Sequence, residues 1–126
     1  MTDVTVWVAD WEMQCCGAPF HVGSEIIWKV VPWTFEHPAV DGLAAIDYAY
    51  DNHSDAPTLR MQGTVIEIQA VYQRYEPDAA GKVKWPVAGK LVAQEGEADG
   101  WNTSCGGYEF SAYFVRVNPC DISEPS

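Results

Sequence analysis

The stretch TLRMQGTVIEIQAVYQRYEP, residues 58–77, decides the fold predicted for this chain. Apolar and polar side chains alternate along it, as they do in a β-strand with one buried face. The face predicted to be buried carries Ile66, Ile68, Ala70 and Tyr72. The stretch is long for one strand, and Gly63 near its start predicts a bulge or a sharp bend. Small barrels need such bends to close, so the stretch indicates a strand of a partly closed barrel.

Shorter pieces of the chain repeat the same two-residue rhythm. We expect further strands over residues 4–11, within 20–33, over 91–94 and over 108–115. The phrase VGSEIIW, in which a glycine turn precedes a strand, is similar to the opening of SH3-like barrels. About five or six strands with short turns between them leave little room for βαβ crossovers. The predicted fold is therefore mainly β (α+β), a small SH3-like or related partly closed antiparallel β-barrel.

One segment, residues 38–52, has a helical pattern instead. Pro38 suits a first helical turn, and the apolar residues that follow recur every three or four positions. They are Val40, Leu43, Ile46 and Tyr50. We expect one α-helix inserted in the barrel, within a single domain over residues 1–120. The polar residues 121–126 are predicted to form a frayed tail.

The charge of the chain excludes two classes of partner. Eighteen acidic residues against seven basic ones give a net charge of −11. Nucleic acids and anionic membrane surfaces both require clustered Lys and Arg, so we expect neither as a partner. No apolar run approaches the roughly 18 residues that cross a bilayer, and MTDVTVWV lacks the basic start of a signal peptide. We therefore expect a cytoplasmic protein.

The motif Cys15-Cys16-Gly17 raises the question of a thiol or metal site. One hypothesis is a zinc or thiol site built on Cys15, Cys16 and His21, with Cys105 as a further ligand or a disulfide partner. Adjacent cysteines in an extended chain point to opposite sides, and the chain has no C-x-x-C pair. The simpler interpretation is that the cysteines are reduced and act as small buried apolar residues.

The aromatic residues are the more interesting candidates for binding. The chain has six tryptophans, too many for all of them to be buried in one small core, and several adjoin turns. Exposed aromatics near loops favour the binding of peptides, small ligands or protein surfaces. The predicted binding residues are Trp11, Trp85, Trp101, Tyr72 and Tyr75. In contrast, we expect five carboxylates to lie on solvated strand faces. They are those of Asp10, Glu12, Glu25, Glu67 and Glu76.

Several motifs resemble, in the same order, a small actinobacterial family catalogued as domain of unknown function 6578. They are VWVADWEMQCCGAPFHVGSEIIW, GTVIEIQAVYQRYEP, WPVAGKLV, ADGW and YEFSAYFVRV, which together cover most of the chain. The resemblance implies a shared fold and no particular reaction.

The sequence favours a binding module without catalytic activity, with an acidic surface and loop aromatics that meet a protein or a small ligand. It leaves two alternatives open. One is the zinc- or thiol-dependent site described above. The other is a structural subunit of a homo-oligomer that pairs through a strand edge.

Overall fold

A computed structural model describes residues 2–52, 57–104 and 106–124 of the chain. Strand β1 (Val4–Ala9) leads directly into the short helix α1 (Asp10–Cys15). The remaining elements are β2 (Glu25–Pro32), β3 (Tyr48–Tyr50), β4 (Leu59–Pro77), β5 (Lys84–Ala93) and β6 (Glu109–Ser123). The prediction of a mainly β fold is therefore confirmed, although the helix is short and lies elsewhere in the chain.

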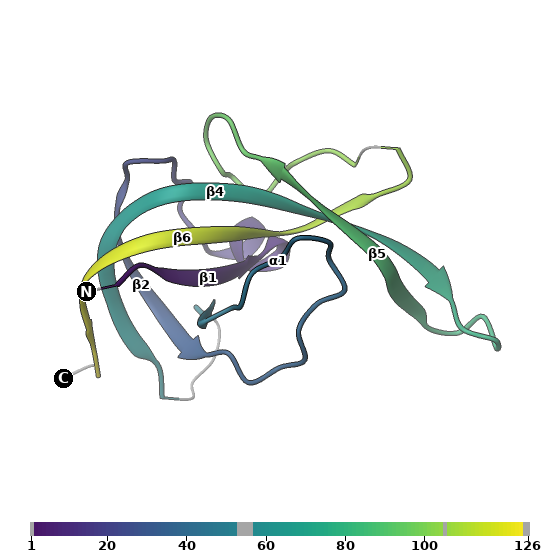
Figure 1. The fold of residues 1–126 in the computed structure, drawn as a ribbon, viewed down its shortest axis with the longest axis horizontal. Helices are drawn as coiled ribbons and strands as arrows, with labels where there is room; N and C mark the ends of the chain where they lie inside the picture. The colour runs from purple at the N-terminus through teal and green to yellow at the C-terminus, as the bar shows by residue number, and fades with distance from the viewer. Residues whose placement is uncertain (1, 53–56, 105, 125–126) are drawn as a thin grey trace.

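The strands form one sheet that closes on itself. Its order is β2-β3-β1-β6-β4-β5, and β2 also pairs with β4, so that the first five of these strands make a ring. All described pairings are antiparallel except that between β1 and β3. Strand β5 lies outside the ring, and Figure 1 shows β4 and β5 leaving it together as a long two-stranded arm.

The long strand β4 belongs to both the ring and the arm. Its pairing with β6 shifts register between Gln62 and Gly63, which confirms the predicted bulge. A side chain at position 63 has no space, because a Cβ there would lie 2.5 Å from the carbonyl oxygen of Asn118. A second register shift, between Val65 and Glu67, reverses the side of the sheet to which the neighbouring side chains of β4 point. The prediction that Ile66 is buried was wrong for this reason: Ile66 is exposed and Val65 is buried.

Apolar side chains fill both the interior of the ring and a patch on its outer face. The interior core combines β1, β2, β4 and β6 through side chains that include Val6, Trp28, Met61 and Tyr113. A smaller outer core contains Val71, Ala112 and Phe114, with Trp7 and Trp33 packed against it. Residues 39–46 lie over this outer patch, because Val40 and Ile46 are buried in it.

The predicted helix over residues 38–52 does not form. Residues 38–47 are turns and irregular chain, and residues 48–50 are strand β3. The apolar spacing correctly indicated burial at Val40 and Ile46, but the backbone hydrogen bonds run to other strands. The N–H of Asp41 donates to Gly89 of β5 at 3.2 Å, and that of Asp47 donates to Thr5 of β1 at 3.2 Å.

Gly42 adds a local reason for the absence of the helix. Its φ of +78° lies in the left-handed region, which a right-handed helix cannot accommodate. The turn that it allows lets the chain fold back over the outer core instead of coiling.

Two further boundaries differ from those expected. Strand β5 begins at Lys84, seven residues before the strand predicted over residues 91–94, and includes Pro86 and Gly89. Strand β6 continues to Ser123, and Ile122 pairs with Met61, so residues 121–123 of the predicted frayed tail are part of the sheet. Across the described ranges, no helix is both long and apolar enough to span a bilayer.

Candidate functional site

Helix α1 places its side chains on two sides of the molecule. Glu12 and Met13 are buried, whereas Trp11 is 56% exposed. The helix is fixed by Gly100: the side-chain amide of Gln14 donates to the Gly100 carbonyl at 2.8 Å, and Met13 packs directly on this glycine. Gly100 has a φ of +89°, and a Cβ on it would lie 2.5 Å from the Met13 Cβ. The close approach therefore requires glycine.

A buried hydroxyl holds the loop that carries Gly100. Tyr113 is fully buried, accepts a hydrogen bond from the Gly100 N–H at 3.0 Å and donates to Asn102 Oδ1 at 2.7 Å. The Asn102 amide in turn donates to the Tyr72 hydroxyl at 3.3 Å and to Gln94 at 2.9 Å. Burial raises the pKa of Tyr113 to about 12, so its hydroxyl keeps its proton throughout the physiological range. This network sets the position of α1 relative to the ring.

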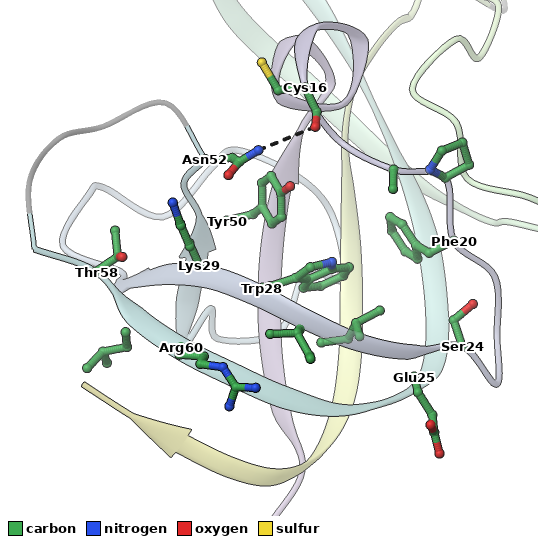
Figure 2. Close-up of a pocket in the computed structure, with 15 residues that line it drawn as sticks. Cys16, Phe20, Ser24, Glu25, Trp28, Lys29, Tyr50, Asn52, Thr58 and Arg60 are labelled. Carbon is green, nitrogen blue, oxygen red and sulfur yellow. Dashed lines mark hydrogen bonds between the residues drawn. The ribbon is translucent and has the colours of Figure 1, made fainter. Parts of the chain in front are cut away.

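A cavity of about 540 Å³, here named the ring cavity, opens on one side of α1. Figure 2 shows three rings at its centre, those of Phe20, Trp28 and Tyr50. Their centroids lie 5.0 Å apart for Phe20 and Trp28 and 5.4 Å apart for Trp28 and Tyr50, both edge to face. Lys29 points to the same side as Asn52, whose side-chain amide donates to the Cys16 carbonyl at 3.4 Å (Figure 2).

A second hollow of about 430 Å³, here named the aromatic groove, lies on the outer face of the ring. Its lining includes the aromatic residues Trp7, Trp11, Trp33 and Phe35. The small residues Ala9 and Ala49 belong to the same lining. Tyr50 also contributes to it, but its ring points into the ring cavity, where it packs on Trp28. Trp33 contacts Trp7 at a centroid distance of 5.8 Å and Phe35 at 5.2 Å.

One polar atom in the wall of the aromatic groove is anomalous. The indole nitrogen Nε1 of Trp33 is buried and has no hydrogen-bond partner among the described residues. A buried donor without an acceptor costs about 1–3 kcal/mol, and most such donors in proteins are satisfied. Phe35, which packs on Trp33, is 65% exposed. The segment is therefore apolar and open to solvent at Phe35, whereas the Trp33 Nε1 atom is enclosed.

Two carboxylates complete the aromatic groove. Glu12 is 1% exposed and accepts a hydrogen bond from the Asn52 N–H at 2.9 Å. Asp51 lines the same space at the end of β3, and its N–H donates to the Lys29 carbonyl at 2.9 Å. At the start of α1, burial raises the pKa of Asp10. Among the described lining residues of the aromatic groove there is no Lys, Arg or His.

A comparison with known proteins identifies the relatives of this chain. The model of a family of unknown function, DUF6578, matches residues 2–119. The chain belongs to the DUF6578 family. The resemblance noted from the sequence is thereby confirmed for the family, whereas an actinobacterial origin stays a prediction. No curated protein and no solved structure matches this DUF6578 chain.

The predicted binding residues of this DUF6578 member do not form one site. Trp11, Trp85 and Trp101 are all strongly exposed, at 56%, 59% and 66%. Only Trp11 lines the aromatic groove; Trp85 lies on the arm, and Trp101 follows Gly100 in its loop. Tyr75 is half-buried and donates to Gln73 at 3.3 Å. Tyr72 is buried against Phe110, and its role in ligand binding stays a prediction.

The three described cysteines are exposed, contrary to the expectation that they are buried. Cys15 ends α1 and Cys16 follows it, and both side chains face solvent, as does that of Cys120. A hydrogen bond with Cys15 raises the pKa of the Cys16 thiol, which is the opposite of the shift that activates a nucleophile. His21 Nδ1 hydrogen-bonds its neighbour, the Val22 carbonyl, at 2.8 Å.

The hypothesis of a zinc site receives no support from the described residues. Among them, no three His, Cys, Asp or Glu side chains gather in a way that could hold a metal ion. Cys15, Cys16 and His21 therefore do not form such a group. The suggested contribution of Cys105 lies outside the described residues.

Of the residues that line the aromatic groove, sequence reasoning predicted only Trp11 as a binding residue, and Glu12, Trp33 and Phe35 are among those it missed. Glu12 was assigned to a solvated strand face, but α1 turns it inward. Phe35 and Trp33 follow β2 in a segment without a regular pattern. The available signal was that Trp33 and Phe35 lie close together just after a strand, where large apolar rings are candidates for a surface aromatic cluster.

Proposed function

We propose that this DUF6578 chain is a binding module without catalytic activity and that its ligand site is the aromatic groove. The observation that carries this proposal is the open hollow of about 430 Å³ whose lining includes the strongly exposed side chains of Trp11 and Phe35. The exposed faces of these two rings gain from being covered by a ligand.

The ring cavity is the weaker candidate for the ligand site. Phe20 and Trp28 lie at its centre but are buried, because they pack on each other as part of the interior core. One polar side chain of its lining, that of Asn52, already hydrogen-bonds the Cys16 carbonyl. A ligand there would compete with existing contacts, whereas a ligand in the aromatic groove would add contacts.

The chemistry of the aromatic groove supports binding more than catalysis. Its described lining residues with polar side chains include Glu12 and Asp51 and also Tyr50, whose hydroxyl lies on the side of the ring cavity (Figure 2). Burial raises the pKa of Tyr50, which keeps this hydroxyl protonated. Cys16 is part of the lining of the ring cavity, but its sulfur points away from the cavity (Figure 2), and the raised pKa of its thiol argues against a nucleophile there.

The alternative of an oligomer that pairs through a strand edge has less support. The edge strand of the sheet is β5, and it carries Lys84, Pro86 and Lys90. Lysines and a proline on an edge strand are typical means of preventing strand addition. We also keep as proposals that the ring is an SH3-like or related small barrel and that the protein is cytoplasmic.

The six tryptophan indole groups provide the test of the proposed site. Each Nε1–H gives a separate signal in a ¹H–¹⁵N spectrum, and a Trp→Phe variant assigns it by its loss. We would screen a mixture of small aromatic, aliphatic, cationic and anionic fragments. Binding in the aromatic groove is expected to shift the signals of Trp11 and Trp33 and to leave that of Trp101 in place, since Trp101 lies outside the groove.

Two outcomes of this screen contradict the proposal. One is a set of fragments that shifts only the Trp28 signal, which would assign binding to the ring cavity. The other is the absence of any shift at Trp11 and Trp33 across the fragment mixture. Trp101→Ala is the control variant, because it removes an indole that is about as exposed as that of Trp11 and lies outside the groove. The shifts at Trp11 and Trp33 should be unchanged in this variant.

A further inference from the structure

Strand β5 has opposite charges at its two ends. Lys82 and Lys84 lie at its start, and both are exposed. Glu95 and Glu97 follow its last residue and are exposed as well. None of these four side chains forms an ion pair with any residue in the described ranges. The outermost strand of the sheet therefore runs from an unpaired positive end to an unpaired negative end.

Exposed apolar side chains lie between these two charged ends. They are Val83, Trp85, Val87 and Val92, each between 44% and 59% exposed. Trp85 lies opposite Glu76 of β4, and Val92 lies opposite Ala70. Glu76 and Ala70 are an even number of residues apart, so Trp85 and Val92 lie on the same side of the β4–β5 pair. This side, here named the arm face, is apolar and is flanked by a charge of each sign.

The backbone holds both charged ends in place. Before the strand, Asp78 Oδ1 accepts hydrogen bonds from the N–H groups of Ala80 at 3.1 Å and of Lys82 at 3.0 Å. After it, Ala98 and Phe20 exchange two backbone hydrogen bonds of 2.7 and 3.2 Å. Figure 1 shows the turn at the end of the arm well away from the loop that follows β5, so the two ends do not meet within one copy. Charges on fixed loops lose little entropy when they dock.

We infer that two copies of this chain associate through the arm face, with their β5 strands antiparallel. A two-fold axis then places the positive end of each strand beside the negative end of the other. Lys82 and Lys84 of one copy meet Glu95 and Glu97 of the second copy, and the same contacts occur again at the other end. The apolar side chains of the arm face are covered between them. The inference goes beyond the proposed function, because it does not involve the aromatic groove.

A second copy fits this surface better than an unrelated protein because the charge pattern of β5 is its own complement. Reversal of the strand direction exchanges the two charged ends, so a second copy supplies both opposite charges at once. An acidic segment of another protein would pair with Lys82 and Lys84 but would leave Glu95 and Glu97 unpaired.

Two properties of the chain limit how the copies can associate. The net charge of −11 opposes their approach, but at physiological salt this repulsion is largely screened beyond about 8 Å, which affects charges in contact far less. Pro86 and the lysines of β5 oppose the addition of a strand, so the copies pack through side chains. Lys84 lies opposite Pro77, on the other side from Trp85, and its long side chain reaches the contact around the outermost strand.

Sedimentation of the full chain over a range of concentrations tests the inference. A dimer is expected to form as the concentration rises to roughly 1 mM. In ¹H–¹⁵N spectra over the same range, the indole signal of Trp85 is expected to shift and that of Trp11 to stay in place, since only Trp85 belongs to the arm face.

Reversal of the charges at the two ends of β5 provides the decisive variants. Lys82→Glu/Lys84→Glu makes both ends negative, and Glu95→Lys/Glu97→Lys makes both ends positive. Each variant alone is expected to raise the dissociation constant of the dimer by at least roughly tenfold. An equimolar mixture of the two is expected to form a heterodimer within about threefold of the original affinity, because every end then faces the opposite charge.

Glu25→Lys/Glu36→Lys is the matched control. It changes the net charge as much as Glu95→Lys/Glu97→Lys does, but at exposed residues outside β5. This control is expected to dimerise at least as tightly as the original chain. If it weakens the dimer as much as the variant at the end of β5, or if the mixture of reversed variants fails to associate, the inference is overturned.

Two further results would also overturn the inference. One is a chain that stays monomeric up to roughly 1 mM, which would leave an acidic partner protein as the occupant of the arm face. The other is a dimer in which the signal of Trp11 shifts and that of Trp85 does not, which would place the contact at the aromatic groove. The fragment screen decides the ligand site independently of both results.

Discussion

Substitution of Tyr113 by Phe tests how the fold positions α1. The variant removes one hydroxyl from a fully buried side chain and leaves the ring in place. Two groups then lose their partner: the Gly100 N–H, which donates to this hydroxyl at 3.0 Å, and Asn102 Oδ1, which accepts from it at 2.7 Å. A buried polar group left without a partner costs about 1–3 kcal/mol. Because Asn102 can turn toward other partners, we expect a total loss of about 2–4 kcal/mol.

Urea unfolding measures this loss. For a small domain with a urea dependence of about 1–3 kcal/mol/M, the midpoint is expected to fall by roughly 1–2 M. Tyr75→Phe is the matched control, because its hydroxyl makes a longer contact of 3.3 Å from a half-buried position; it should cost less than about 1 kcal/mol. The reasoning is refuted if Tyr113→Phe costs less than about 0.5 kcal/mol or no more than the control.

Three further predictions follow from the same description. The pKa of Tyr113 is raised to about 12 in the folded protein, above the ordinary value of about 10. Its contribution to the free energy of unfolding is therefore complete below about pH 10 and declines by up to about 3 kcal/mol as the pH rises to 12. The same decline should be shallower in Tyr113→Phe. Gly100→Ala forces a Cβ against α1 at a φ of +89°, whereas the Cβ of Gly96→Ala meets no atom within 4 Å at a φ of +97°. Thermal unfolding should therefore show that Gly100→Ala lowers the free energy of unfolding by at least about 1 kcal/mol more than Gly96→Ala does. Cys15 and Cys16 should react with a disulfide reagent in the folded protein, with the pH dependence of Cys16 displaced upward; labelling only after unfolding would show that they are not exposed.

The strands were predictable where one face of the sheet is buried and the other is not, because apolar and polar residues then alternate along the sequence. The alternation in residues 58–77 and the glycine at position 63 predicted a long bent strand, because each property acts locally on the chain. The prediction for Ile66 was wrong because the second bulge in β4 depends on its pairing with β6, which lies far away in the sequence. A two-residue rhythm therefore defines a strand but not the register of its bulges.

The candidate site was less predictable than the fold. The segment around Val40 and Ile46 has helical spacing, yet its hydrogen bonds go to β1 and β5, which a local pattern cannot reveal. Exposure of Trp11 was predicted correctly, but its neighbours in the groove come from β1, β3 and the chain after β2. Glu12 was missed because a helix of six residues is too short to give a periodic signal.

The pairing of β1 with β6 has a consequence for the order of folding. Val4 lies opposite Val117, so the antiparallel partner of β1 is the last described strand, whereas its parallel partner β3 contributes only two residue pairs. During synthesis, β1 therefore has no antiparallel partner until β6 has left the ribosome. Closure of the ring is then a late step dominated by contacts distant in sequence, and such topologies acquire their native structure slowly compared with helical proteins of similar size.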